Sequence, residues 1–313
     1  MQFDGVVFPG QGTQFLGMGE DFVNQYDDAK QVFKIAKDAL GFDLYKICQS
    51  DEEKLNNTEY TQPAILAVEI AMYLVLKNHY GLSPVFFAGH SLGEYTALVA
   101  AEVIPFDVAL QIVRFRGKLM QEAIFPNKEA SMVAIIMDPL PLEQIKTISD
   151  SFGVDVANDN SIQQVVLSGY SEDIKSTVSA IERYWPNQAI RVVYLTVKAP
   201  FHSRYMETIE TPFREFLDLF KNKFKTTHLT SVVSNYNGDF YADLKIETLI
   251  NGLTKQISGS VKWRQNMNAL IKYSKDILEI GPAAPLRGFF KSIGVTVQTV
   301  TSVRAINKMF VDV

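Results

Sequence analysis

Cysteine, tryptophan and histidine are scarce in this sequence, which has one Cys, two Trp and four His among its 313 residues. The single thiol, Cys48, cannot form a disulfide within the chain, and it has no neighbouring cysteine for a structural zinc site. Cys48 ends an amphipathic stretch over residues 44–48. We therefore interpret it as a buried structural thiol rather than a nucleophile.

Long apolar runs and basic clusters are also missing. No segment approaches the ~20 apolar residues of a membrane helix, and residues 1–5 lack the basic region of a secretory signal. The formal net charge is −5, with no Lys/Arg-rich stripe, so sequence-independent nucleic-acid binding is not expected. The composition predicts a cytoplasmic, globular protein that binds neither nucleic acid nor membrane.

The two ends of the chain alternate short apolar runs with helical patterns, which is typical of the α/β class. Strands are expected at residues 6–8, 85–88, 229–234 and 276–280, and helices at 28–40, 63–77, 94–103 and 211–220. The helix over 63–77 is apolar nearly all round, which predicts that it is buried.

The middle of the chain has a different pattern. Strands are expected at 132–137, 154–157, 164–168 and 190–197, with helices at 141–151 and after Ser171, which we expect to cap its helix. This β-α-β-β-α-β order is ferredoxin-like. We predict a small domain over 125–195, inserted into a large α/β domain formed by 1–124 and 196–313.

One motif combines strand, turn and helix. Gly89-His90-Ser91-Leu92-Gly93 follows a short apolar run and precedes a helical stretch rich in Ala, Leu and Val. In G-x-S-x-G, a sharp turn projects the serine above the sheet, and small flanking residues let backbone pass close by. An ordinary glycine-bounded turn is the alternative, and the matching strand and helix weigh against it.

A serine nucleophile needs a base, and histidine is suited to neutral pH. His90 adjoins Ser91, but adjacent side chains on a turn point apart; His79 and His228 lie in polar surroundings that indicate the surface. His202 follows an expected strand, so it is the best-placed base, with a structural histidine as the alternative. Separately, the glycines around Gln11 would let its backbone N–H approach a ligand, although a plain turn has the same pattern.

Five separated blocks, read together, resemble a known family. They are Pro9-Gly10-Gln11-Gly12, Gly89-His90-Ser91-Leu92-Gly93-Glu94, Arg116-Gly117-Lys118-Leu119-Met120, Pro200-Phe201-His202-Ser203, and Gln256 with Val261-Lys262-Trp263. Their order and spacing are similar to those of the malonyl-CoA:acyl-carrier-protein transacylases, which serve fatty acid and polyketide synthesis. The resemblance runs over nearly the whole chain, and it implies an α/β-hydrolase-like large domain with an inserted small one.

The resemblance implies a role for each matching residue. Ser91 would be the acyl nucleophile and His202 its base, oriented by a backbone carbonyl near Gln256. The backbone N–H groups of Gln11 and Leu92 would form the oxyanion hole.

It also implies the substrate and its partner. Arg116 would hold the free carboxylate of malonate, a role for which the planar guanidinium is suited; without the resemblance Arg114 is equally available, and Arg116 reads as a surface residue on a helix that ends at Gly117. Phe201 would favour malonyl over methylmalonyl. The implied partners are malonyl-CoA and an acyl carrier protein bearing 4'-phosphopantetheine, with no metal and no cofactor.

Two other functions stay open. A hydrolase that clears acyl groups from carrier proteins is one, although such relatives tend to lack the arginine. A docking module without catalysis is the other. We expect a monomer, and Lys118, Lys255 and Lys262 are candidates for carrier contact, each read more simply as a solvated surface lysine. Where the family commonly has Gly-Pro-Gly, the chain has Gly281-Pro282-Ala283.

Overall fold

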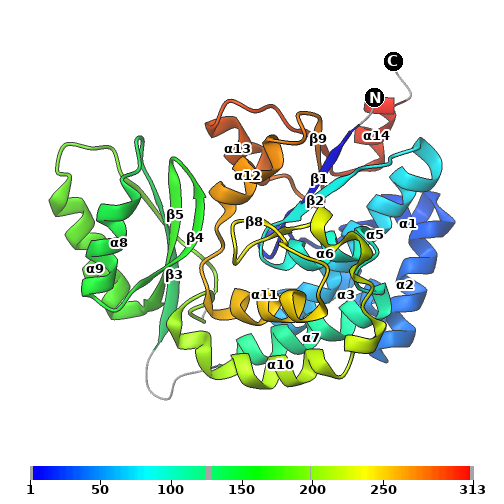
Figure 1. Ribbon diagram of the computed structural model, residues 1–313, viewed down its shortest axis with the longest axis horizontal. Coiled ribbons are helices and arrows are strands. Elements are labelled where there is room, and N and C mark those ends of the chain that lie inside the picture. Colours follow the sequence, from blue (N-terminus) through cyan, green and yellow to red (C-terminus); the bar gives the residue numbers. More distant parts are fainter. Residues whose placement is uncertain (1–2, 124–128, 198, 311–313) are drawn as a thin grey trace.

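The computed structural model describes residues 3–123, 129–197 and 199–310 and contains two four-stranded sheets (Figure 1). One sheet is parallel, with the order β10-β9-β1-β2, and its strands are β1 (Gly5–Phe8), β2 (Phe86–Gly89), β9 (Ile277–Ile280) and β10 (Gln298–Val300). This confirms the predicted mixed α/β class with a mostly parallel sheet.

The parallel sheet is covered by helices on both faces, because its short strands are apolar on both sides. Val6 and Phe8 pack into one hydrophobic cluster, while Val7, between them, packs into another. The first cluster is formed with α1 (Glu20–Gln25), α2 (Asp27–Leu40), α3 (Leu44–Ser50), α4 (Glu52–Leu55), α5 (Thr58–Tyr80), α6 (Leu92–Ala100), α7 (Phe106–Glu122), α10 (Glu210–Asp218) and α11 (Ile246–Ser258). The second is formed mainly with α12 (Trp263–Ile271) and α13 (Leu286–Ser292).

The second sheet is antiparallel and lies at one end of the molecule, with α8 (Leu142–Ser151) and α9 (Ser171–Tyr184) on its outer face (Figure 1). Its order is β4-β5-β3-β6, from β3 (Ala130–Ile136), β4 (Asp155–Ser161), β5 (Gln164–Tyr170) and β6 (Arg191–Tyr194). A third hydrophobic cluster fills the space between this sheet and its helices. The predicted strands and helices of this region are therefore present, while the predicted boundary at 124/125 lies outside the described residues.

The remaining elements are short. They are the 3-10 helices η1 (Arg204–Ile209), η2 (Lys221–Lys223) and η3 (Thr226–Ser231), the two-stranded sheet of β7 (Val233–Ser234) and β8 (Asp239–Phe240), and α14 (Val303–Phe310).

Several predicted boundaries were wrong. The alternative interpretation, in which the helix that carries Arg116 ends at Gly117, is wrong, since α7 runs on to Glu122. Gly117 permits close packing of α7 against the start of α5, because a Cβ there would lie 2.4 Å from the carbonyl oxygen of Thr58. Ser171 is the first helical residue of α9 and Tyr170 is the cap, without a side-chain hydrogen bond. The expected strand over 229–234 is only partly present, because residues 229–231 belong to the 3-10 helix η3 and only Val233–Ser234 forms a strand, β7.

Two predictions about buried groups are confirmed. The thiol of Cys48 is fully buried, and burial raises its pKa to about 12, so it stays protonated at neutral pH. The helix expected over 63–77 is α5, and it is buried along most of its length. Across the described ranges, none of the helices combines the length and the apolarity needed to span a bilayer.

Candidate active site

Ser91 lies at a sharp turn between β2 and α6. Its backbone has φ 54 and ψ −101, a conformation that a non-glycine residue adopts only under local constraint. The flanking glycines make the turn possible: a Cβ at Gly89 would lie 1.9 Å from the carbonyl oxygen of Gly93, and one at Gly93 would lie 2.2 Å from that of Phe8. The predicted strand, turn and helix around the serine are thus confirmed.

His202 reaches Ser91 from a loop more than a hundred residues away in sequence. Its Nε2 lies 2.7 Å from the Oγ of Ser91, and its Nδ1 lies 2.7 Å from the backbone oxygen of Gln256. A carbonyl oxygen only accepts, so Nδ1 carries the proton and Nε2 is left to accept the serine hydroxyl. Burial, and then the charge of Arg116, lowers the pKa of His202 to about 3, which keeps the imidazole neutral.

The other three histidines lie elsewhere. His90 hydrogen bonds through Nε2 to the Oδ1 of Asn160, at 2.8 Å, and not to Ser91. His79 and His228 are exposed, as their polar surroundings predicted.

Arg116 extends from α7 into the same site. Its side chain is almost fully buried, and its Nη2 donates to the Oγ of Ser91 at 3.1 Å and to the Oε1 of Gln256 at 3.0 Å. Its Nη1 donates to the Oε1 of Gln62 at 2.9 Å. Burial lowers the pKa of this guanidinium, but arginine stays charged at neutral pH. Arg114, in contrast, is partly exposed and pairs with Glu59.

Gln11 lies on the loop after β1, beside the serine turn. A Cβ at Gly10 would lie 2.4 Å from the backbone oxygen of His90 and 3.7 Å from the backbone nitrogen of Leu92, so the two loops are in close contact. The side chain of Gln11 donates to the Oγ1 of Thr58 at 3.2 Å. Phe201 is buried directly before His202.

The sequence reasoning missed four residues that hold this site together: Gln62, Glu94, Asn235 and Tyr241. The Oδ1 of Asn235 accepts the backbone N–H of Ser91 at 2.6 Å, and its Nδ2 donates to the oxygen of Gly89 at 2.7 Å. Glu94 is a charged residue within a mainly apolar helical stretch, and this signal could have identified it. Gln62 ends the polar run over 56–62 and gives no such signal. Asn235 and Tyr241 have no such signal, because long-range contacts alone place them.

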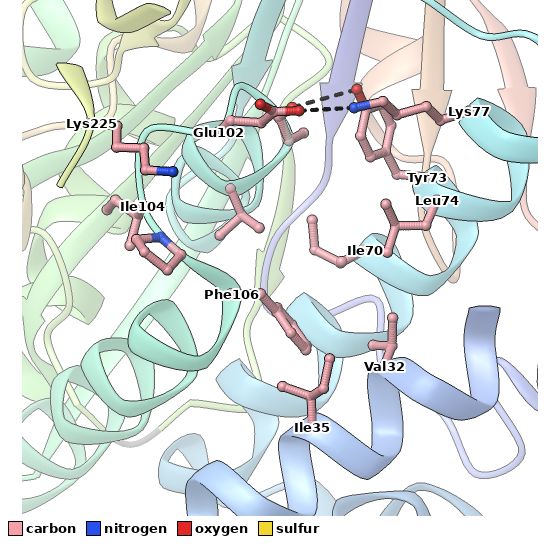
Figure 2. A pocket seen from close by; sticks show the side chains of 13 residues that line it. Val32, Ile35, Ile70, Tyr73, Leu74, Lys77, Glu102, Ile104, Phe106 and Lys225 are labelled. Atoms are coloured by element: carbon pink, nitrogen blue, oxygen red, sulfur yellow. Dashed lines mark hydrogen bonds and ion pairs between the residues drawn. The ribbon is translucent and has the colours of Figure 1, made fainter. Parts of the chain in front are cut away.

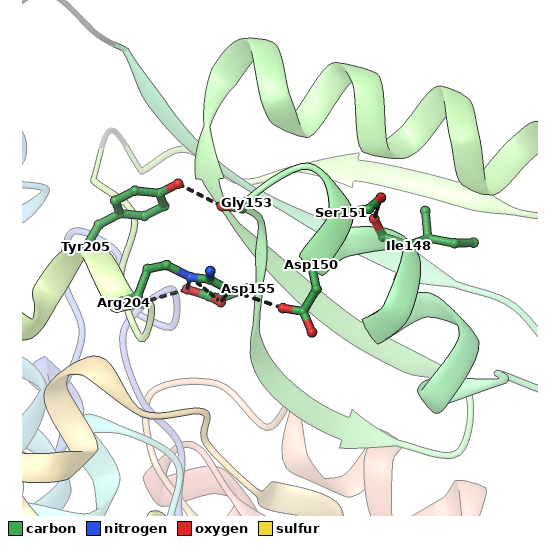
Figure 3. A network of polar contacts seen from close by, with 7 residues as sticks. All are labelled: Ile148, Asp150, Ser151, Gly153, Asp155, Arg204 and Tyr205. Carbon is green, nitrogen blue, oxygen red and sulfur yellow. Dashed lines mark hydrogen bonds and ion pairs between the residues drawn. The ribbon is translucent and has the colours of Figure 1, made fainter.

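A cleft of about 720 Å³ opens beside His202, between the antiparallel sheet and the rest of the molecule. A polar network crosses its edge (Figure 3): the carboxylate of Asp155, in β4, accepts the backbone N–H of Arg204 at 2.7 Å and the Nε of that side chain at 2.9 Å. Asp150 accepts a further bond from Arg204, and the hydroxyl of Tyr205 donates to the oxygen of Gly153 at 2.7 Å. The network ties the loop of His202 to the antiparallel sheet.

β4 also contacts the segment that leads into α12 and the start of that helix. The backbone of Val261 pairs with β4 at Asn158, and Arg264 forms an ion pair of 3.0 Å with Asp159. β4 runs on to Ser161, four residues beyond the predicted strand, and its polar residues 158–161 are buried.

Another hollow, of about 370 Å³, lies between α2, α5 and the start of α7 (Figure 2). Its walls are mainly apolar, with Lys77 and Glu102 paired at 2.9 Å on its rim. None of the residues placed around Ser91 lines it. Across the described residues, no group of His, Cys, Asp or Glu is arranged to hold a metal ion.

A parallel α/β sheet that presents a serine on a strand-to-helix turn, hydrogen bonded to a histidine, is the arrangement of enzymes that transfer or hydrolyse acyl groups. Residues 6–280 match the family described as "Acyl transferase domain". The chain belongs to the malonyl CoA-acyl carrier protein transacylase family and is an acyltransferase.

The relatives support this assignment over nearly the whole chain. The malonyl CoA-acyl carrier protein transacylase of Staphylococcus aureus strain MRSA252 is 37% identical over 316 residues, covering 97% of this chain and 98% of the relative. The solved structure of the Streptococcus pneumoniae enzyme has a TM-score of 0.90 at 31% identity, covering 99% of each chain. A malonyl-transacylase solved in complex with its type II PKS acyl-carrier protein has a TM-score of 0.90 at 33% identity, covering 100% of each chain.

Proposed function

We propose that this enzyme transfers malonyl from malonyl-CoA to the phosphopantetheine thiol of an acyl carrier protein, through an ester on Ser91. One observation carries the proposal: the hydroxyl of Ser91 lies within hydrogen-bond distance of both the Nε2 of His202 and the Nη2 of Arg116. A base and a cation therefore meet at one nucleophile, which is what a carboxylated acyl substrate requires.

In the first half of the reaction, Ser91 attacks the thioester carbonyl while His202 takes its proton. The tetrahedral oxyanion accepts hydrogen bonds from the backbone N–H groups of Gln11 and Leu92. The close contact between the loops of these two residues supports this role. Loss of one such donor typically costs on the order of 100-fold in rate. Collapse of the intermediate breaks the C–S bond, and His202 returns the proton to the departing coenzyme A thiolate.

Arg116 binds the free carboxylate of the malonyl group. Its hydrogen bonds to Gln62 and Gln256 go to neutral amide oxygens, so these contacts do not pair its charge with a carboxylate of the protein. In a buried site this charge pairs strongly with a substrate carboxylate. A hydrolase acting on simple acyl chains would leave the guanidinium unpaired, which disfavours that alternative.

In the second half, His202 takes the proton of the carrier thiol, whose sulfur attacks the ester carbonyl. Collapse of this intermediate breaks the ester C–O bond, and His202 returns the proton to the Oγ of Ser91. The proposed carrier is consistent with the relative solved with its acyl-carrier protein. The cleft beside His202 is a route by which a phosphopantetheine arm could reach the ester. The proposed reaction requires no cofactor, because Ser91, His202 and Arg116 supply the nucleophile, the base and the cation.

We also propose the finer architecture implied by the resemblance: an α/β-hydrolase-like large domain, 1–124 and 196–313, with an inserted ferredoxin-like domain over 125–195. The β-α-β-β-α-β succession and the strand order β4-β5-β3-β6 support it. Expression of 125–195 alone would test it, since an independent domain gives a cooperative unfolding transition.

The activity is tested by intact-protein mass spectrometry after brief mixing with malonyl-CoA or acetyl-CoA. We expect a gain of one malonyl group, ~86 Da, that is absent in Ser91→Ala, and little acetyl adduct. A second mixing with holo carrier protein should remove the adduct and add it to the carrier. Release of the group to water in preference to the carrier would replace the proposal with the hydrolase.

A further inference from the structure

Glu94 is a fully buried carboxylate three residues after Ser91, in the first turn of α6. The hydroxyl of Tyr241 donates to its Oε1 at 2.6 Å. Its Oε2 accepts the backbone N–H of Asn235 at 3.1 Å and the Nε2 of Gln256 at 2.7 Å. The acid–base chemistry proposed above does not use this carboxylate, yet it is held by three donors.

The contacts of Glu94 fix the orientation of one amide group. The Nε2 of Gln256 lies between two acceptors, the Oε2 of Glu94 and the backbone oxygen of Ser91 at 2.9 Å. Only an N–H can face two acceptors, so the Oε1 of the same amide must point the other way. There it accepts the Nη2 of Arg116 at 3.0 Å.

This chain of contacts ends at the substrate-binding cation. The Nη2 that Gln256 holds is also the one that lies 3.1 Å from the Oγ of Ser91. The negative charge of Glu94 thus stands one amide away from the guanidinium of Arg116. It offsets the buried cation without a direct hydrogen bond to it.

We propose that Glu94 is a positioning residue that, through the side chain of Gln256, aims Arg116 at the acyl group and so sets the preference for carboxylated substrates. The inference rests on the proposed malonyl transfer. A purely structural role, tying the serine turn to α11, is the competing explanation, and it would affect every acyl group alike.

Burial of Glu94 is costly, and this cost is shared with Glu279, so the contacts that lead to Arg116 are what single Glu94 out. Burial raises the pKa of Glu94 to about 7, against the lowering effects of Tyr241, Asn235, Gln256 and Arg116. An apolar residue would avoid this penalty and suit the otherwise apolar helix.

The test compares malonyl and acetyl loading of Ser91 in Glu94→Gln, by rapid-mixing mass spectrometry. A glutamine presents a donor as well as an acceptor, so it competes with the Nε2 of Gln256 and releases the orientation of that amide. We expect the ratio of malonyl to acetyl loading rates to fall by roughly tenfold or more, mainly through the malonyl rate. Tyr241→Phe removes one anchor of Glu94 while keeping the ring, and it should lower the ratio by roughly threefold.

Glu279→Gln is the matched control. Glu279 is also a buried carboxylate whose pKa burial raises to about 7, and it accepts the backbone N–H groups of Leu286 and Arg287. It lies in β9, which β1 separates from the strand before Ser91. This variant should leave the malonyl-to-acetyl ratio unchanged.

The outcomes distinguish a failure of the proposed function from a failure of the role proposed for Glu94. If wild-type protein does not load malonyl in preference to acetyl, the proposed function fails, and the inference fails with it. If wild type prefers malonyl but Glu94→Gln and Tyr241→Phe lose both rates equally, or lose neither, Glu94 has no role in selectivity. Should Glu94→Gln not fold, as judged by circular dichroism, Tyr241→Phe alone decides.

Discussion

Two arginines in this molecule are held in opposite ways. Arg116, at the serine, is 1% exposed and donates to the neutral oxygens of Gln62, Gln256 and Ser91. Arg204, at the edge of the cleft, has a side chain 48% exposed and pairs with the carboxylates of Asp150 and Asp155. The first guanidinium contacts only neutral oxygens, whereas the second pairs with two carboxylates of the protein.

The direction of each pKa shift reflects this difference. Burial lowers the pKa of Arg116, whereas the carboxylate of Asp155 raises that of Arg204. A buried cation without a carboxylate partner in contact costs folding free energy, so it persists where it has a use. A half-exposed ion pair is worth little to stability, about 0–1 kcal/mol. Changes in the buried surroundings of Arg116 should therefore affect the loading of Ser91 strongly, and changes at the exposed Arg204 should affect it weakly.

The largest expected effect concerns the protonation of His202, in the buried region beside Arg116. Since the pKa of His202 is lowered to about 3, we expect its imidazole to stay neutral from pH 8 to pH 5. The unfolded chain binds a proton on this histidine near pH 6.5, and the folded chain does not, so stability falls as the pH is lowered. This histidine therefore removes about 1.4 kcal/mol of stability for each pH unit below 6.5, down to its folded pKa.

Nitrogen-15 NMR of labelled histidine measures this directly, with His202→Ala to assign the signal. The ring shifts should remain those of the tautomer protonated on Nδ1, because that nitrogen donates to the backbone oxygen of Gln256. A titration with a midpoint near pH 6.5 would contradict the buried, neutral base.

Removal of the buried cation comes next. Arg116→Met should lower malonyl loading of Ser91 by about 100-fold or more and leave acetyl loading within a few-fold. It should also lower the urea midpoint, because the buried amide oxygens of Gln62 and Gln256 lose their donor and Glu94 loses the nearby cation.

Arg114→Met is the control for that experiment, because Arg114 lies two residues away, is partly exposed and pairs with Glu59 at 3.0 Å. It should retain malonyl loading. Equal losses in the two variants would show that the helix matters rather than the position of the guanidinium.

Phe201→Ser tests a smaller effect of shape beside the base. Phe201 is buried directly before His202, and we propose that its ring limits the space for a 2-methyl group on the acyl chain. Discrimination of one methyl by shape is worth ~1–3 kcal/mol. We expect methylmalonyl loading relative to malonyl to rise by about tenfold, measured by mass spectrometry with the two thioesters in competition. An unchanged ratio would rule out Phe201 as the specificity determinant.

These sites differ in how far sequence could predict them. The strand before Ser91 and the glycines of its turn form a local pattern, so both were predicted. The course of α7 through Gly117 was not, because the glycine serves a close approach to Thr58, far away in sequence. The partners of Ser91 and Arg116, such as Asn235 and Gln62, come from distant segments and follow no local period. Position 116 was chosen over 114 by resemblance alone.

The smallest effect is expected at the exposed pair. Arg204 follows His202 by two residues, and Asp155 accepts both its backbone N–H and its side chain. His202 has a positive φ of 55, so its conformation depends on such neighbours. Arg204→Ala keeps the backbone bond and removes the ion pair, so it should slow malonyl and acetyl loading together by about threefold, with a stability loss of about 1 kcal/mol or less.

Arg214→Ala is the matched control, since Arg214 is another partly exposed arginine paired with a carboxylate, that of Glu247, and joins α10 to α11. It should change stability to a similar extent without slowing loading. Asp155→Ala also deletes the acceptor of the Arg204 backbone N–H and should slow both acyl groups further than Arg204→Ala. If Arg204→Ala instead lowered malonyl loading selectively, the exposed arginine would share substrate binding with Arg116, and the contrast between the two regions would fail.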